Sequence, residues 1–169
     1  MGEDIGEPMA ESNAQESGMF LEPERSLTPE HLKKLYPSIH ILPRLKEIYT
    51  DRVDPWIKIL HLPTFWAVLT DGLRRPHDMP TSLEAVVFAF CLATVSSLSD
   101  LECQEVFGAQ KAVMYDRYRA ATRQALVNAG FLSTSDPMTL RAYSLFMVRF
   151  LVIVTRSELT DEAVRQKRL

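Results

Sequence analysis

Apolar residues recur at helical spacing along most of the chain, whereas strand-like alternation is not sustained anywhere. The stretch 43–53 carries a stripe at this spacing, made of Leu45, Ile48, Tyr49 and Val53. The stretch 81–98 is apolar almost all round, which predicts a central helix, and the stretch 137–155 is apolar on most sides. We therefore expect an all-α fold, an antiparallel bundle or superhelix of about five to seven helices joined by short loops.

Prolines, glycines and small polar residues predict where the first helices begin and end. Thr28 precedes a proline and is expected to cap a short helix that ends near Tyr36. Pro55 breaks the chain after the second helix, and Pro63 is placed to begin a third. Gly72 is predicted to end that third helix.

Two pairs in the second half, Thr81 with Glu84 and Ser99 with Glu102, have the spacing of a capping box. The first pair predicts the start of the apolar helix 81–98. The second predicts one long helix that continues to about residue 129 and is closed by a glycine. Its expected buried face consists of Phe107, Met114, Tyr118, Ala121 and Ala125.

Asp136 and Pro137 are expected to open the last long helix, which runs to about residue 155. The longest apolar runs, 83–95 and 142–154, are shorter than the roughly 20 residues that cross a bilayer. No transmembrane helix is therefore expected.

The first 27 residues differ in composition from the rest of the chain. They hold seven acidic residues against Arg25, with few large apolar side chains. Such a segment cannot bury enough surface to offset its ordering entropy. We expect a disordered acidic tail at 1–27, a helical domain at 28–155, and a polar tail or short helix at 156–169.

Charge gives no reason to expect binding to nucleic acid. The whole chain has a net charge of −3, and without the acidic segment the remainder carries +3, with no concentrated basic stripe. The tail is interpreted as solubilising. An acidic transcription-activating segment is the alternative, because Met19, Phe20 and Leu21 lie among acidic residues.

The residues that usually carry chemistry do not converge in this sequence. There is no glycine-rich phosphate loop and no nucleophile elbow, and the four histidines lie on separate segments. His61 is either a partly buried ring with a shifted pKa or a ring that satisfies backbone groups at a turn. No catalytic residue, cofactor or metal ligand is predicted.

The two cysteines, Cys91 and Cys103, fit neither a zinc site nor a disulfide-rich secreted scaffold. Cys91 is expected to be a small buried hydrophobe, and Cys103 to be made more acidic by a helix dipole. Because the acidic N-terminal residues do not read as a secretory signal, we expect a reduced intracellular protein.

The stretch from Leu42 to Phe65 resembles the opening of the regulatory middle homology region of fungal binuclear zinc-cluster transcription factors. The most specific part is Pro55–Phe65, which reads Pro-x-x-x-x-Leu-His-x-Pro-Thr-Phe. The resemblance continues in the same order to about residue 150, through Ser82–Ala85, Cys103–Gly108, Tyr118–Ala121 and Asp136–Ala142.

The residues that carry this resemblance are expected to be structural. They are Tyr49, Pro55, Trp56, His61, Pro63, Thr64 and Phe65. The two prolines set helix boundaries, and Thr64 is expected to satisfy free backbone donors at a helix start. Trp56 and Phe65, with Ile59 and Leu60, are expected to anchor the turn in the core.

The resemblance implies transcription regulation in the nucleus, for a metabolic or specialised-metabolite gene cluster. The family's DNA-binding module uses six cysteines around two zinc ions, and no cysteine precedes Leu42. We therefore expect a truncated or stand-alone relative that acts through protein contacts. Its expected partner is a full-length factor or a second copy, with no direct DNA binding, no membrane and no enzymatic activity.

Two alternatives remain from the sequence, an inactive gene relict or partial gene model of a DNA-binding activator, and a small helical enzyme. In the family, further helices usually cover the one that matches 137–155. We therefore expect an exposed apolar surface around Phe146, Phe150 and Ile153, which favours a partner, self-association or aggregation.

Overall fold

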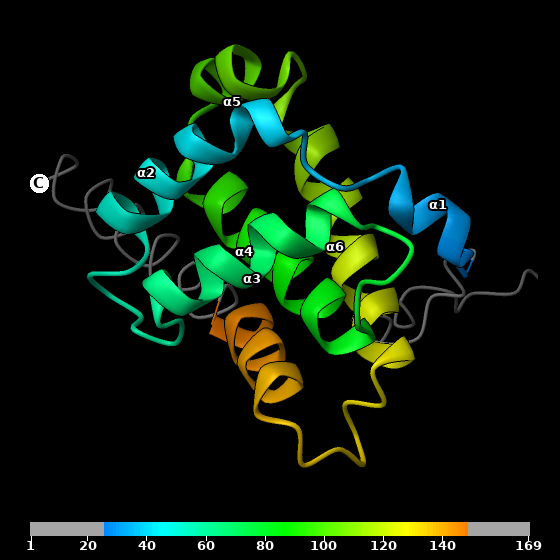
Figure 1. The fold of residues 1–169 in the computed structure, drawn as a ribbon. Coiled ribbons are helices and arrows are strands. Elements are labelled where there is room, and N and C mark those ends of the chain that lie inside the picture. Colours follow the sequence, from blue (N-terminus) through cyan, green and yellow to red (C-terminus); the bar gives the residue numbers. More distant parts are fainter. Residues whose placement is uncertain (1–25, 149–169) are drawn as a thin grey trace, which may run out of the picture.

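The computed structural model describes residues 26–148, and within them all regular structure is helical (Figure 1). The elements are α1 (Pro29–Lys33), the 3₁₀ helix η2 (Ile39–Ile41), α2 (Leu42–Arg52), α3 (Leu62–Arg74), α4 (Thr81–Ser97), α5 (Asp100–Phe107), α6 (Lys111–Asn128) and a last helix that spans 137–148. The all-α prediction is confirmed. The predictions for residues 1–25 and 149–169, including most of the acidic tail, lie outside the described residues.

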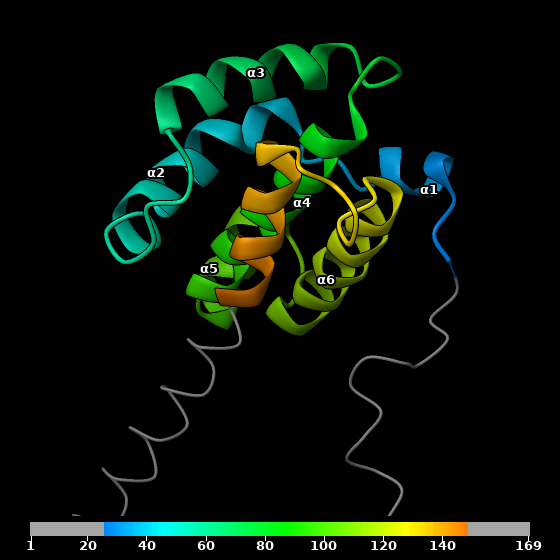
Figure 2. The same ribbon diagram turned by 90° about the horizontal axis from the view of Figure 1, so that it is seen from below.

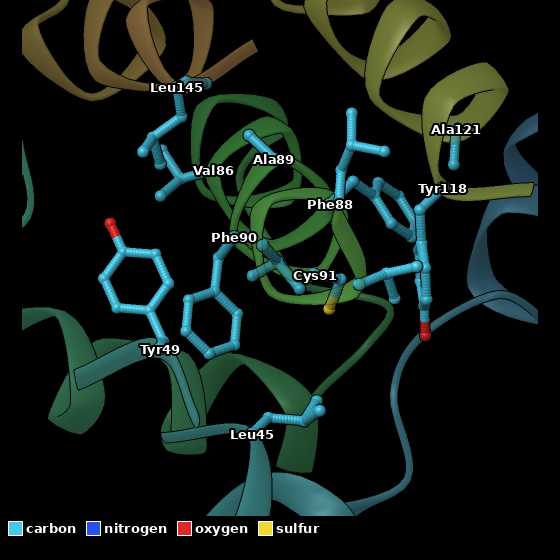
Figure 3. Packing of buried hydrophobic residues seen from close by; sticks show 14 of the residues in the cluster. Leu45, Tyr49, Val86, Phe88, Ala89, Phe90, Cys91, Tyr118, Ala121 and Leu145 are labelled. Atoms are coloured by element: carbon cyan, nitrogen blue, oxygen red, sulfur yellow. The ribbon is translucent and has the colours of Figure 1, made fainter. Parts of the chain in front are cut away.

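α4 lies at the centre of the molecule, with α2, α3, α6 and the 137–148 helix around it (Figures 1 and 2). Its residues from Leu83 to Leu92 are all buried, and its most extensive contact is with α6. Figure 3 shows how one helix serves several neighbours: Phe90 points toward Tyr49 of α2, and Phe88 toward Tyr118 of α6. A helix that is apolar all round needs such an enclosure.

The first two helices follow their sequence signals. The Thr28 hydroxyl accepts a hydrogen bond from the backbone N–H of His31 and caps α1. The stripe predicted for α2 is buried at Leu45, Ile48 and Tyr49, and Val53 is buried just beyond the helix.

α3 does not end at Gly72, as its sequence suggested, but continues to Arg74. A Cβ atom on Gly72 would lie 2.9 Å from Cδ2 of Leu83 and 3.2 Å from Cε of Met79. The glycine therefore allows α3 to approach the start of α4 closely, and it does not act as a helix stop.

The predicted capping box at the start of α4 does not form. Thr81 is already the first helical residue, and the preceding Pro80 makes no side-chain cap. Glu84 is buried and accepts a 2.5 Å hydrogen bond from the hydroxyl of Tyr36. It therefore ties α4 to the segment after α1.

The capping box of Ser99 and Glu102 is present, with both of its hydrogen bonds, and it opens α5. The long helix predicted after it is divided in two, because Gly108 has φ +68° and ends α5. Gly130, with φ +65°, follows the end of α6 as predicted. Four residues of the predicted face, from Met114 to Ala125, are buried, while Phe107 is half-buried.

The last helix begins as predicted at Asp136 and Pro137. The Asp136 carboxylate accepts hydrogen bonds from the backbone N–H groups of Met138 and Thr139 and from the Thr139 hydroxyl. Its predicted end near residue 155 lies outside the described residues.

Candidate functional site

The motif segment Pro55–Phe65 forms the connection between α2 and α3. A turn closes it at the α2 end, where the N–H groups of Trp56 and Ile57 donate to the carbonyl of Val53. At the other end Pro63 occupies the first turn of α3, where a missing N–H costs nothing. Leu60 and Phe65 are buried, and Ile59 packs against the core while partly exposed.

An aromatic cluster forms around Phe90 of α4 with residues from both sides of this connection. The Phe90 ring centroid lies 4.9 Å from that of Tyr49, 5.4 Å from that of Phe65 and 5.7 Å from that of Trp66. The Lys46 ammonium covers the outer side of the cluster, 5.3 Å from the Trp66 ring centroid. The motif therefore fixes α2 and α3 to the central helix.

His61 and Thr64 contact each other across the start of α3. Nδ1 of His61 lies 2.8 Å from the Thr64 hydroxyl, and neither side chain caps the backbone of α3. The expectation that Thr64 satisfies backbone donors is therefore wrong. His61 is exposed, so it does not occupy the partly buried place that its apolar neighbours suggested.

Trp56 does not anchor the core. It is 84% exposed on the turn after α2, although every neighbouring signal placed it inside. The reason is the turn itself: the core positions are taken by Val53 before it and Leu60 after it, so the indole faces water. Tryptophan, with tyrosine and arginine, is enriched among the residues that contribute most to binding at protein interfaces.

The hydroxyl of Tyr49 is buried, and no group within residues 26–148 forms a hydrogen bond with it. Burial, followed by the nearby charge of Asp54, raises the pKa of this phenol. The ring packs in the aromatic cluster, so Tyr49 contributes through its apolar body.

An ion pair that the sequence did not reveal joins α2 to α5. Arg52 donates to both carboxylate oxygens of Glu102, over 3.0 and 2.5 Å, and also to the Ser97 carbonyl. The Arg52 hydrogen bond, followed by those from Ser99, lowers the pKa of Glu102 to about 2. The spacing of Ser99 and Glu102 indicated the cap, but no local signal indicates a partner 50 residues away.

A shallow groove of about 260 Å³ lies beside this ion pair, between η2, α2 and α5. Its lining mixes charged and apolar side chains, namely His40, Ile41, Arg44, Ile48, Arg52, Leu98, Glu102, Glu105 and Val106. Arg52 and Glu102 in this lining are paired with each other, so the groove is not built to bind a ligand of strong positive or strong negative charge.

Both cysteines are buried. Burial raises the pKa of Cys91, whose side chain lies on the Tyr118 side of α4 (Figure 3). Burial also raises the pKa of Cys103, so the prediction of a more acidic thiol is wrong. Desolvation outweighs the helix start at this position.

The described residues contain no group of three or more histidine, cysteine, aspartate or glutamate side chains that could hold a metal ion. No helix within them is long and apolar enough to cross a bilayer.

The exposed apolar side chains are found in other places than predicted. Phe146 is only 8% exposed, because its side of the 137–148 helix packs into the core. Phe150 and Ile153 lie outside the described residues. The outer side of the same helix instead exposes Leu140, Tyr143 and Met147.

Comparison with known proteins relates this chain to transcription regulators. It is 34% identical over 120 residues to the aurofusarin cluster transcription factor aurR2 of Gibberella zeae, which covers 71% of this chain and 18% of that protein. It is 34% identical over 119 residues to the transcriptional regulator AacuB of Aspergillus aculeatus, over 70% of this chain and 16% of the regulator.

A third relative is the C6 finger domain transcription factor adaR of Aspergillus niger, with 34% identity over 126 residues, 73% of this chain and 15% of the factor. The chain thus spans less than a fifth of the length of these relatives. No family model matches the chain. No solved structure matches it either.

Proposed function

The chain is homologous to a segment of fungal C6 zinc-cluster transcription factors, and from this relationship we propose that it regulates transcription through contacts with other proteins. The observation that carries the proposal is that the chain is 34% identical to each of three such regulators, over 119 to 126 residues. The proposed compartment is the nucleus.

The proposed targets are genes of a specialised-metabolite cluster. One relative is named as the aurofusarin cluster transcription factor, and another, from Pyricularia oryzae, as a pyriculol/pyriculariol biosynthesis cluster transcription factor. The pathway served by this chain does not follow from those names.

The side chains of the shared motif support a role in protein contacts and not in chemistry. Tyr49 and Phe65 pack around Phe90, and the prolines set helix ends. Trp56 is presented to solvent. None of these residues forms an acid, base or nucleophile set, so the geometry favours a helical scaffold with an interaction surface.

Direct reading of DNA is not part of the proposal for this chain. It contains only two cysteines, whereas a C6 module needs six, and both are buried in the helical fold. The proposed partner is a full-length zinc-cluster factor or a second copy of the chain.

A tethering assay tests the regulatory role. The full chain is fused to a heterologous DNA-binding domain, and expression of a reporter behind its binding site is measured. A change in either direction supports the proposal, whereas an unchanged reporter with a stably expressed fusion contradicts it. Phe90→Ala provides a control for the fold, because loss of the cluster centre should destabilise the helical domain and weaken the effect on the reporter.

Affinity capture from nuclear extract of a fungus that carries a related cluster tests the contact. We expect the tagged chain to retain a zinc-cluster factor, and the variant Trp56→Ser to retain less of it at unchanged stability, since the indole is exposed. Retention of no such factor by a folded chain that also does not self-associate would overturn the role of protein contacts.

A further inference from the structure

The 137–148 helix has an inner and an outer apolar side. On the inner side Ala142, Leu145 and Phe146 are buried. On the outer side Leu140 is 45% exposed and Tyr143 38% exposed. A helix that packs on one side usually carries mostly polar residues on the other, so this outer side exposes more apolar surface than one-sided packing within the described residues requires.

The outer side is continuous with the turn that follows α6. Phe131 of that turn stacks on Tyr143, with ring centroids 5.3 Å apart. The adjacent Leu132 is 87% exposed, and Val127 in the last turn of α6 is 61% exposed. These five residues, Val127, Phe131, Leu132, Leu140 and Tyr143, are called the 127–143 surface. Exposed clusters of this kind mark interaction sites.

The N-terminal part of the chain joins the described fold next to this surface. Ser26, the first described residue, donates a 3.1 Å hydrogen bond from its hydroxyl to Oε1 of Gln124. Val127 lies three residues further along α6, about 5 Å along the helix axis. Whatever precedes Ser26 therefore starts within one helical turn of the 127–143 surface.

The sequence before Ser26 contains one apolar triplet of the right kind. Met19, Phe20 and Leu21 stand together five to seven residues before Ser26, between Glu16 and Glu22. Six extended residues reach about 20 Å, well beyond the single helical turn that separates Gln124 from Val127. The chain length thus permits contact within one molecule.

Charge favours the same contact. Residues 1–27 carry a net charge of −6, and the rest of the chain carries +3. Arg141 is exposed directly beside Leu140 on the 137–148 helix, where acidic residues flanking the triplet would meet it. Opposite charges at the rim of an apolar contact fix its register more than they add affinity.

We propose that Met19, Phe20 and Leu21 bind the 127–143 surface of their own chain. Attachment at Ser26 makes this an intramolecular event, for which short linkers give effective concentrations on the order of millimolar. Even a weak contact is then occupied. The proposal does not depend on the regulatory role of the protein, since it concerns how the chain covers its own apolar surface.

Photo-crosslinking in the full chain tests the contact. A benzophenone amino acid replaces Phe20, and the crosslinked peptides are mapped by mass spectrometry in an equal mixture of isotope-labelled and unlabelled protein. We expect crosslinks from position 20 to 127–143 within one chain. Crosslinks between labelled and unlabelled chains would show that the surface binds a second copy of the chain. Crosslinks to other residues, or none, would show that position 20 does not contact the surface. Each of these results would overturn the proposal.

Binding of an apolar dye supplies an independent readout. The triple variant Met19→Ser, Phe20→Ser, Leu21→Ser is expected to increase dye fluorescence several-fold, because it uncovers the surface. Adding Leu140→Ser and Leu132→Ser should cancel that increase, with helix content checked by circular dichroism. Ile5→Ser and Leu101→Ser are the controls, one in the acidic segment and one exposed on α5. Equal dye binding by the triple variant and the parent would also overturn the proposal.

Discussion

α4 is apolar on nearly all sides in sequence, and the stretch 137–155, which includes the 137–148 helix, is apolar on most sides, yet the fold uses the two helices differently. α4 is enclosed by helices on several sides, so Phe88 and Phe90 are both fully buried while they point in different directions (Figure 3). The 137–148 helix covers α4 from one side only, so Leu145 is buried and Leu140 is 45% exposed (Figure 2). Within the described residues, an apolar helix thus forms the core in one case and an exposed surface in the other.

The difference shows that a helix which is apolar on most sides needs neighbours to bury it, but that its sequence does not show whether those neighbours are present. The apolar sides of α4 are buried by α2, α3, α6 and the 137–148 helix. The 137–148 helix is covered on one side within the described residues, and its exposed apolar side chains are part of the surface to which Met19, Phe20 and Leu21 are proposed to bind. Substitutions on the two helices should therefore differ strongly in their effect on stability.

The largest effect is expected at Phe90, whose ring contacts the aromatic rings of Tyr49, Phe65 and Trp66. Phe90→Ala removes a fully buried ring and leaves a cavity, which should lower the free energy of unfolding by about 3–5 kcal/mol. Urea unfolding followed by tryptophan fluorescence measures it, since Trp66 lies in the cluster. A loss below about 1 kcal/mol would show that the cluster does not hold α2 and α3 on α4.

The two sides of the 137–148 helix can be compared directly. Leu145→Ala empties a buried position and should cost about 2–5 kcal/mol, whereas Leu140→Ala on the outer side should change stability by about 0.5 kcal/mol or less. Chemical denaturation of the two variants under one condition provides the test. Equal losses would mean that the outer side is already covered by a stable contact.

The hydrogen bond of Tyr36 to Glu84 tests how α4 keeps its single charged side chain in a buried position. Tyr36→Phe removes the 2.5 Å bond and should cost about 1–2 kcal/mol, because the carboxylate then loses its hydroxyl partner. Tyr143→Phe is the control, since that ring is partly exposed and keeps its stack. If both phenylalanine variants unfold at the parent's urea concentration, the bond adds nothing to stability.

Local signals predicted the helices well where the deciding atoms are near in sequence. Thr28, Ser99 and Asp136 each cap the helix predicted for them, because a cap is made with backbone N–H groups two or three residues away. Pro63 likewise begins α3, and burial of Leu45 and Ile48 follows from helical period.

The failures involve contacts between residues far apart in sequence. Glu84 has capping-box spacing, but its carboxylate instead accepts a hydrogen bond from the hydroxyl of Tyr36, 48 residues away in sequence. Gly72 is a residue type that often ends helices, but here it lies within α3 and leaves room for Leu83 of α4. Trp56 was placed in the core by its residue type, and the turn geometry exposes it. In the candidate site, burial of Phe65 in the core was therefore predictable from the sequence, whereas exposure of Trp56 was not.

The smallest expected effect concerns the ion pair of Arg52 and Glu102, which joins α2 to α5 outside the apolar core. Because the pKa of Glu102 is about 2 in the fold and about 4.5 ordinarily, its charge stabilises the protein above about pH 4.5, and this contribution is lost as the pH falls toward 2. Glu102→Gln keeps the capping box, since glutamine also accepts at that position, but removes the charge. The stability difference between parent and variant should therefore shrink between pH 4.5 and pH 2.5, measured by urea unfolding at low salt, while Glu105→Gln, exposed on the same helix, should show a smaller change. A difference that stays constant across this range would mean that the charge of Glu102 does not stabilise the contact between α2 and α5.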